Sequence, residues 1–266
     1  MRILYIGDVM GEVGMQVVET ILPTLRRSEK IDVVVAQAEN VTDGKGLSAA
    51  DYKRLKRAGV DGFSGGNHTP SRSDTLDLIT DPNIPVVAPV NMPDLLGPGY
   101  KYVTGLSGAK VLMISLLGQI VGRDADKPVE NPLHMIDEIL ARENLNNRGV
   151  VVVNFHGDYS SEKVVIGHYL DGRASVVVGD HWHVPTADAR VLPGGTAHQT
   201  DVGMCGALDS SLGVTYDSII TRWRDGKVTK NLLETAGPRQ FNALLVDLDD
   251  TTYLATGARA IQRILD

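Results

Sequence analysis

The chain has 266 residues, of which 42% are hydrophobic and 22% charged, a composition typical of a compact α/β protein rather than a disordered or fibrous one. Its formal net charge of −7 argues against a broad electrostatic surface for nucleic acid or anionic membrane, so we expect no stable nucleic-acid complex. A small phosphate ester remains compatible with this charge, because a local metal ion can outweigh the charge of the whole surface.

The N-terminal segment "MRILYIGDVMG" contains an apolar run of about five residues, which is too short for a signal-peptide core or a membrane span. Residues 2–6 of this segment predict a short strand. The strand stops at "GDVMGEVG", after which residues 15–27 have the apolar spacing of a helix. We therefore expect a β–loop–α unit at the start of a protein without a membrane segment.

The next elements continue this alternation. "DVVVAQ" at 32–37 predicts a strand covered on both faces, because it is almost entirely apolar. A helix is expected from Ser48, as its cap, to Ala58. Then follow the strand "DGFSG", the loop "GNHTP" and a helix over residues 71–79.

The second half has the same pattern with different spacing. "KVLMISLLG", "GVVVVNFHG" and "RASVVVGD" predict apolar strands, and "LHMIDEILARE" between the first two predicts an amphipathic helix. The single cysteine, Cys205, excludes an internal disulfide and suits a reducing compartment, so we expect a cytoplasmic protein. Residues 244–250 are expected to pair through a turn with 257–265. No linker of low complexity interrupts the chain, so we expect one domain over 1–266, with a homo-oligomer as the ordinary assembly.

Polar side chains follow five of the predicted strands, each just beyond the carboxyl end. In open α/β sheets, that edge is where ligands bind. Burying carboxylates and imidazoles costs free energy unless each has a partner. A purely structural role is therefore a poor explanation for eight such residues at strand ends. The residues are Asp8, Glu39, Asn40, Asn67, His68, His156, His181 and His183.

These side chains are suited to binding metal. Carboxylate and amide oxygens combined with imidazole nitrogens, and no thiolate, favour manganese, iron or zinc over calcium. This number of donors exceeds what one ion needs, so we expect two ions that share one carboxylate ligand. Glu39 is our candidate for the shared ligand. Each residue also has a plainer interpretation: Asp8 as a helix cap, and a lone histidine as a hydrogen-bonded core residue. We assign His134 and His198 to structure or surface, and His168 to structure.

A dinucleotide site is the rival interpretation. Gly7, Gly11 and Gly14 form a glycine-rich turn, and Glu39 ends the second strand, where such folds keep an acid for the ribose. However, the glycine spacing is wrong. Asp8 would also repel a pyrophosphate at that turn.

Six segments in order resemble one family. "GDVMG", "AENVTDGKGL", "GGNHT", "FHGDYSSEK", "DGRASVVVGDHWHVPTAD" and "LPGGTAHQTDVGMCG" are similar to the YmdB-type branch of the calcineurin-like metallophosphoesterases. The similarity extends from residue 1 to about residue 250. It implies an α/β fold, a four-layer αββα sandwich with two mixed β-sheets, and the activity of a 2′,3′-cyclic-nucleotide 2′-phosphodiesterase.

The resemblance also implies a role for each residue. One metal ion would be held by Asp8, Glu39, Asn40 and His183, and the other by Glu39, Asn67, His156 and His181. His68 would be the proton donor. The expected reaction is attack on phosphorus by a metal-bridging hydroxide, with His68 protonating the departing ribose oxygen and a 3′-nucleotide as product.

Two other functions stay open from the sequence. A regulatory protein could sense a cyclic nucleotide and turn it over slowly, although the retained His68 argues against that. The second alternative is a phosphomonoesterase or phosphodiesterase with a broader range of substrates. The chain also departs from the family at Pro70 and Ser71, where an aromatic and an acidic residue are usual, and at Trp182, where a small polar residue is common. These departures bear on substrate preference, and we consider Trp182 and Tyr159 as candidate faces for base stacking.

Overall fold

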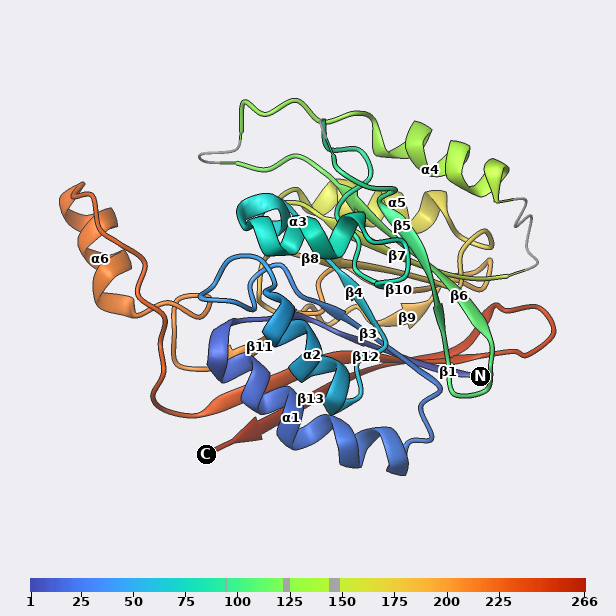
Figure 1. Cartoon of the computed structure of the whole chain (residues 1–266), viewed down its shortest axis with the longest axis horizontal. Helices are drawn as coiled ribbons and strands as arrows, with labels where there is room; N and C mark the ends of the chain where they lie inside the picture. The colour runs from blue at the N-terminus through green and yellow to red at the C-terminus, as the bar shows by residue number, and fades with distance from the viewer. Residues whose placement is uncertain (94, 122–124, 144–148) are drawn as a thin grey trace.

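The chain folds into four layers, in which two mixed β-sheets pack face to face and helices cover both outer surfaces (Figure 1). The computed structural model describes residues 1–93, 95–121, 125–143 and 149–266. The four-layer α/β sandwich with two mixed sheets, which the family resemblance implied, is confirmed.

The first sheet carries both chain termini. Its path runs β2-β11-β12-β1-β3-β4, and β13 pairs with β12 beside this path. β1 is parallel to β3 but antiparallel to β12, so the sheet is mixed. The strands are β1 (Arg2–Ile6), β2 (Asp8–Val9), β3 (Val33–Gln37), β4 (Gly62–Ser64), β11 (Met204–Ala207), β12 (Arg239–Leu248) and β13 (Ala255–Leu265).

The second sheet has the order β5-β6-β7-β8-β10-β9. Its central strands β6, β7 and β8 are parallel, whereas β5 and β9 are antiparallel to their neighbours. The strands are β5 (Tyr100–Thr104), β6 (Lys110–Leu117), β7 (Val150–His156), β8 (Val176–Asp180), β9 (Arg190–Val191) and β10 (Ala197–Gln199).

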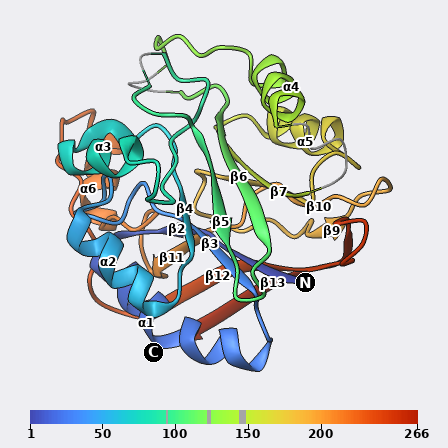
Figure 2. The same ribbon diagram turned by 45° about the vertical axis from the view of Figure 1, so that its right-hand side comes forward.

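Helices form the two outer layers. α1, α2 and α3 pack on the first sheet, and α4 and α5 lie together on the outer face of the second (Figure 2). α6 projects from the rest of the molecule (Figure 1). The helices are α1 (Gly11–Ser28), α2 (Ala49–Ala58), the 3-10 turn η1 (Thr69–Ser71), α3 (Ser73–Thr80), α4 (Pro132–Arg142), α5 (Ser160–Tyr169) and α6 (Tyr216–Asp225).

Apolar side chains fill all three spaces between these layers. On β3, Val33 and Val35 face the second sheet, whereas Val34 and Ala36 face the helices. Successive residues of a strand point to opposite faces, so a strand in the middle of a four-layer protein is apolar throughout. This confirms the expectation for residues 32–37. The domain assignment of 1–266 stays a prediction, which the core shared by the two sheets supports.

Two local predictions are confirmed, and the state of the single cysteine is explained. The Ser48 hydroxyl accepts a hydrogen bond from the Asp51 amide at 3.1 Å, as an N-cap should. β12 and β13 form the expected antiparallel pair. Cys205 is fully buried, and burial raises the pKa of its thiol to about 12, so it is a packed residue rather than a reactive one.

Other elements escaped the sequence analysis. α5 carries the consecutive apolar residues 164–166, which lack a helical period. α6 carries apolar residues at 216, 219, 220 and 223, which is the spacing of a helix, but none of its residues is buried. Within the described residues, every helix is too short or too polar to cross a lipid bilayer.

A backbone contact near the end of β8 leads to a stability prediction. A Cβ atom on Gly179 would lie 1.9 Å from the carbonyl oxygen of Thr200, and neither backbone can move without disturbing the sheet. We expect Gly179→Ala to lower the free energy of unfolding by at least about 2 kcal/mol in urea titrations. Gly257→Ala is the control, because the nearest atom to its Cβ would be a side-chain oxygen at 3.4 Å. Equal effects of the two substitutions would contradict this account.

Candidate metal centre

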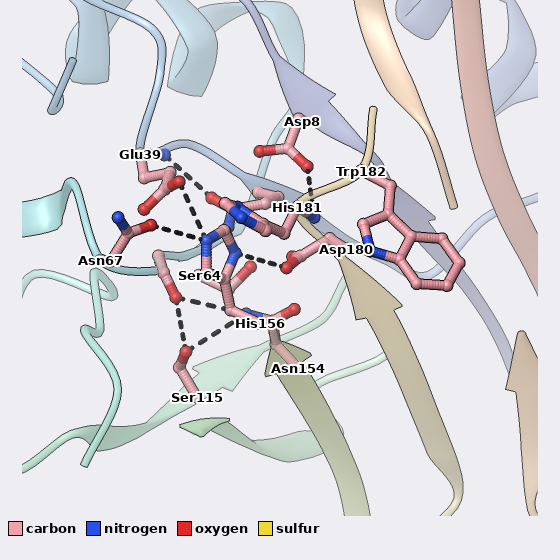
Figure 3. Close-up of polar contacts among 12 residues, drawn as sticks. Asp8, Glu39, Ser64, Asn67, Ser115, Asn154, His156, Asp180, His181 and Trp182 are labelled. Atoms are coloured by element: carbon pink, nitrogen blue, oxygen red, sulfur yellow. Dashed lines mark hydrogen bonds and ion pairs between the residues drawn. The ribbon is translucent and has the colours of Figure 1, made fainter. Parts of the chain in front are cut away.

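The eight predicted side chains lie together at one edge of the sandwich. β1, β3 and β4 are parallel in the first sheet, and β7 and β8 are parallel in the second, so their carboxyl ends supply residues to the same region. Figure 3 shows Glu39, Asn67 and His156 pointing toward one another, with Asp8 and His181 nearby. Among the described His, Cys, Asp and Glu residues, Glu39, His156 and His181 have ligand atoms within 4.8 Å of one another. The structure therefore brings together residues that are far apart in the sequence.

Glu39 lies at the centre of this group and is 1% exposed. Its Oε1 is 3.2 Å from His156 Nε2, across the gap between the sheets. Its Oε2 accepts a hydrogen bond from the His68 amide at 2.8 Å. Burial alone raises the pKa of this carboxyl, but the imidazoles of His156, His68 and His181 lower it well below its usual range overall. Glu39 is thus an anion that contacts residues from both sheets.

His156 ends β7 and is completely buried. Its Nδ1 donates to Asp180 Oδ1 at 2.6 Å, and its Nε2 is 2.9 Å from Asn67 Oδ1. Burial by itself lowers the pKa of His156, but the carboxylates of Glu39 and Asp180 raise it well above its ordinary value. In the absence of a metal ion, a proton on Nε2 thus supplies the positive charge that these carboxylates require.

Asp8, Asn40 and His183 form the second part of the group. Asp8 Oδ1 accepts a hydrogen bond from Asn40 Nδ2 at 3.2 Å and is 3.6 Å from His183 Nε2. His183 Nδ1 donates to the carbonyl oxygen of Leu212 at 3.1 Å. A carbonyl oxygen can only accept, so Nδ1 carries a proton and Nε2 is directed at Asp8 and Asn40.

His181 connects the two parts. Its ring packs edge-on against that of His156, with centroids 4.4 Å apart, and its backbone amide donates to Asp8 Oδ2 at 3.3 Å. His181 and His183 have φ angles of 94° and 61°, left-handed values that are uncommon outside glycine. Burial, followed by the neighbouring His156, lowers the pKa of His181 to about 3, which keeps its ring neutral and able to act as a ligand.

His68 differs from the other imidazoles in exposure. Its side chain is 31% exposed, against 22% for His181, 9% for His183 and 0% for His156. Its Nδ1 lies 2.9 Å from Asn40 Oδ1, so the ring is oriented by a residue of the cluster. His68 therefore faces the part of the site that is open to solvent.

The two glycines before Asn67 are explained by close contacts. A Cβ on Gly66 would lie 2.4 Å from the His156 ring, and one on Gly65 would lie 2.1 Å from Thr69 Oγ1. The Gly65 carbonyl also accepts hydrogen bonds from Ser115 and Asn154 of the second sheet. Only glycine permits the turn after β4 to pass this close to the opposite sheet.

The donor set fits metal ions. It combines carboxylate and amide oxygens with imidazole nitrogens, without a thiolate, which suits manganese, iron or zinc. His156 and His183 are each oriented through Nδ1 by an oxygen acceptor, the arrangement usual for metal-ligating histidines. Buried carboxylates of Asp8, Glu39 and Asp180 also make a local negative charge that a cation balances.

Sequence reasoning missed Asp180. It is the last residue of β8 and is fully buried, with Oδ1 on His156 and Oδ2 within 3.3 Å of the Tyr5 hydroxyl. Its position at a strand end, directly before "HWH", was a signal of the same kind as that of Asp8.

Lys163 lies over one face of the Trp182 ring, which leaves at most the other face for a base. The indole points away from the cluster (Figure 3), donates through Nε1 to the Asp158 carbonyl, and has Lys163 Nζ 3.8 Å from its ring centroid. Tyr159 is 49% exposed and stays a candidate for base stacking.

Comparison with known proteins agrees with this geometry. A family model described as "YmdB-like protein" matches residues 4–264. A 2′,3′-cyclic-nucleotide 2′-phosphodiesterase of Bacillus subtilis is 38% identical, with all of this chain and 97% of the relative aligned. A crystal structure of a hypothetical protein from Thermus thermophilus has a TM-score of 0.88 and 34% identity, covering 99% of both chains. That of a novel phosphatase from Mycoplasma pneumoniae has a TM-score of 0.89 and 30% identity, covering 99% of this chain and 93% of that one.

The buried charge of Asp8 can be tested in metal-free protein. Burial raises the pKa of Asp8 to about 6, and His183 only partly offsets this. As the pH rises from about 4 to 6, the unfolded carboxyl ionises before the folded one, so the contribution of Asp8 to wild-type stability falls. We expect metal-free Asp8→Asn to be more stable than wild type by roughly 1–3 kcal/mol above pH 6, with the difference vanishing below pH 4.

The measurement is urea unfolding in a chelator at several pH values. Asp209→Asn, which alters an exposed carboxylate, should produce no such pH-dependent difference. A constant difference between Asp8→Asn and wild type from pH 4 to 7 would refute the role assigned to burial.

Proposed function

The chain belongs to the YmdB-like protein family, and on that basis we propose that it is a metal-dependent phosphodiesterase that hydrolyses 2′,3′-cyclic nucleotides to 3′-nucleotides. The observation that carries the proposal is the convergence of eight polar side chains from five strand ends on one largely buried group. The name of the Bacillus relative supplies the substrate class, a small cyclic phosphate ester.

Two metal ions are proposed at this centre, with manganese or iron as the candidates. Asp8, Glu39, Asn40 and His183 would hold one ion, and Glu39, Asn67, His156 and His181 the other. Bound there, the ions would act as Lewis acids that activate water and stabilise the negative charge of the phosphoryl group. The contacts of Glu39 with residues of both sets support it as the shared ligand.

The residues of the chain then have separate tasks. Asp180 and the Leu212 carbonyl hold the imidazoles of His156 and His183 in the tautomer that presents Nε2. His68 is proposed as the proton donor to the departing 2′ oxygen, because it is the most exposed imidazole of the group. Asn40, through Oδ1, keeps the His68 ring in place beside the centre.

A broader phosphatase is the second candidate, because the Mycoplasma pneumoniae structure is titled a novel phosphatase. A phosphate monoester places more negative charge at the site than a cyclic diester does, so rates for the two classes at matched concentration separate the candidates. A protein that binds cyclic nucleotides with slow turnover would show affinity without a comparable rate.

The substrate assignment makes a direct prediction. With Mn²⁺ added, the protein should convert 2′,3′-cyclic AMP mainly to 3′-AMP, and faster than it hydrolyses 3′-AMP or p-nitrophenyl phosphate. Chromatography of the products identifies the isomer, and treatment with a chelator should abolish the reaction. Formation of 2′-AMP, or a preference for monoesters, would count against the proposal.

The role of His68 makes a second prediction. His68→Ala should lower turnover by about 10²- to 10⁴-fold, the usual contribution of general acid catalysis, while the metal content stays at the wild-type level. His168→Ala, at an exposed histidine on α5, is the matched control and should retain full activity. Loss of metal from His68→Ala would show instead that His68 is a ligand.

A further inference from the structure

A buried ion pair lies behind the loop that carries His181 and His183. Lys163 of α5 and Asp201, which follows β10, are both 0% exposed, and Lys163 Nζ donates to Asp201 Oδ2 at 2.8 Å. The same Nζ donates to the backbone carbonyl of Asp180 at 2.6 Å. Neither side chain belongs to the metal-binding group described above.

Both partners contact the loop at its centre. Asp201 Oδ2 accepts a hydrogen bond from the Trp182 backbone amide at 3.0 Å, and Lys163 lies over the Trp182 indole. The indole in turn donates to the Asp158 carbonyl at 3.0 Å, and Asp158 Oδ2 is 3.3 Å from His181 Nε2. The pair thus holds the residue between the two histidines by its backbone and by its ring.

The loop needs such support because of its backbone conformation. The φ angles of His181 and His183 are left-handed, and non-glycine residues keep such conformations only where the surroundings impose them. A fully buried ion pair contributes little net stability, because desolvation offsets the attraction. A role in fixing the position of the loop therefore explains the pair better than stability does.

We propose that Lys163 and Asp201 are a positioning pair, which holds the His181–Trp182–His183 loop so that its two imidazoles are presented to the metal centre. The pair also fixes the backbone of Asp180, whose side chain orients His156. Three of the proposed ligands thus depend on two residues that do not themselves bind metal. This inference rests on the proposed metal-dependent function.

The test replaces both partners together, since removing one alone would leave a buried unpaired charge. The variant Lys163→Met/Asp201→Asn keeps the side-chain volumes and one acceptor for the Trp182 amide. Lys101→Met is the matched control: Lys101 is also buried, but its Nζ lies within hydrogen-bond distance of four backbone carbonyls in the last turn of α3 and just after it. The Lys101→Met variant should be less stable than wild type, but the conformation of the His181–Trp182–His183 loop should not change.

The first measurement needs no metal. The chain has two tryptophans, and Trp223 is 84% exposed, so Trp223→Phe leaves Trp182 as the reporter. In this background, the double variant should show an acrylamide quenching constant for Trp182 at least about twofold above that of its parent, because the loop opens more often. The Lys101→Met control should show the parent value. Unchanged quenching in the folded double variant would overturn the proposal.

The second measurement is Mn²⁺ binding by calorimetry. We expect the double variant to bind Mn²⁺ about 10- to 100-fold more weakly than wild type, the usual cost of losing residues that orient ligands, with Lys101→Met unchanged. Equal weakening in both variants would indicate a general loss of stability and reject the positioning role. Lys163→Gln/Asp201→Asn, which likewise removes both charges, is the second variant if the first does not fold, and it should shift both readouts in the same direction. Failure of wild type to bind Mn²⁺ would contradict the proposed function, while the quenching result would still decide the role of the pair.

Discussion

The arrangement of the site depends on the contacts of the Glu39 carboxylate with residues of both sheets. It is buried between the two sheets, accepts from the His68 amide beside β4 and meets His156 at the end of β7. A buried carboxylate is tolerable only if charges or hydrogen bonds compensate it. The surrounding imidazoles provide that compensation, and in doing so they bring the ends of strands from both sheets to one point. The same negative charge makes the site selective for cations.

A polar network beneath the site links it to the core. Most of the space between the sheets is filled by valine and other apolar side chains, but near the site the Tyr5 hydroxyl contacts Ser64, Asn154 and Asp180 at 2.7 to 3.3 Å. Buried polar groups of this kind are costly unless each is satisfied, so they fix one relative placement of the two sheets. The placement of the sheets and the orientation of His156 by Asp180 are therefore coupled.

The sequence allowed much of the fold to be predicted, for reasons that particular elements illustrate. β3 and β7 are continuous apolar runs, which fit strands buried on both faces, and Ser48 is a cap with a local hydrogen-bond partner. α5 was missed because its apolar residues do not follow a helical period. α6 was missed although its apolar residues at 216, 219, 220 and 223 have helical spacing. Asp180 was missed although it stands at a strand end, because nothing in the sequence says which of several acids faces an imidazole from another element.

By itself the sequence determined the alternation of strands and helices and the placement of Asp8, Glu39, Asn67 and His156 at or near strand ends, because periodicity and chain order are local properties. Tertiary structure alone decided which atoms meet. The tautomer of His183 depends on a carbonyl 29 residues away in sequence, and the left-handed loop that presents it depends on Lys163 and Asp201. Such contacts join segments distant in the chain, and their geometry follows from how two sheets and a helix pack rather than from any local preference.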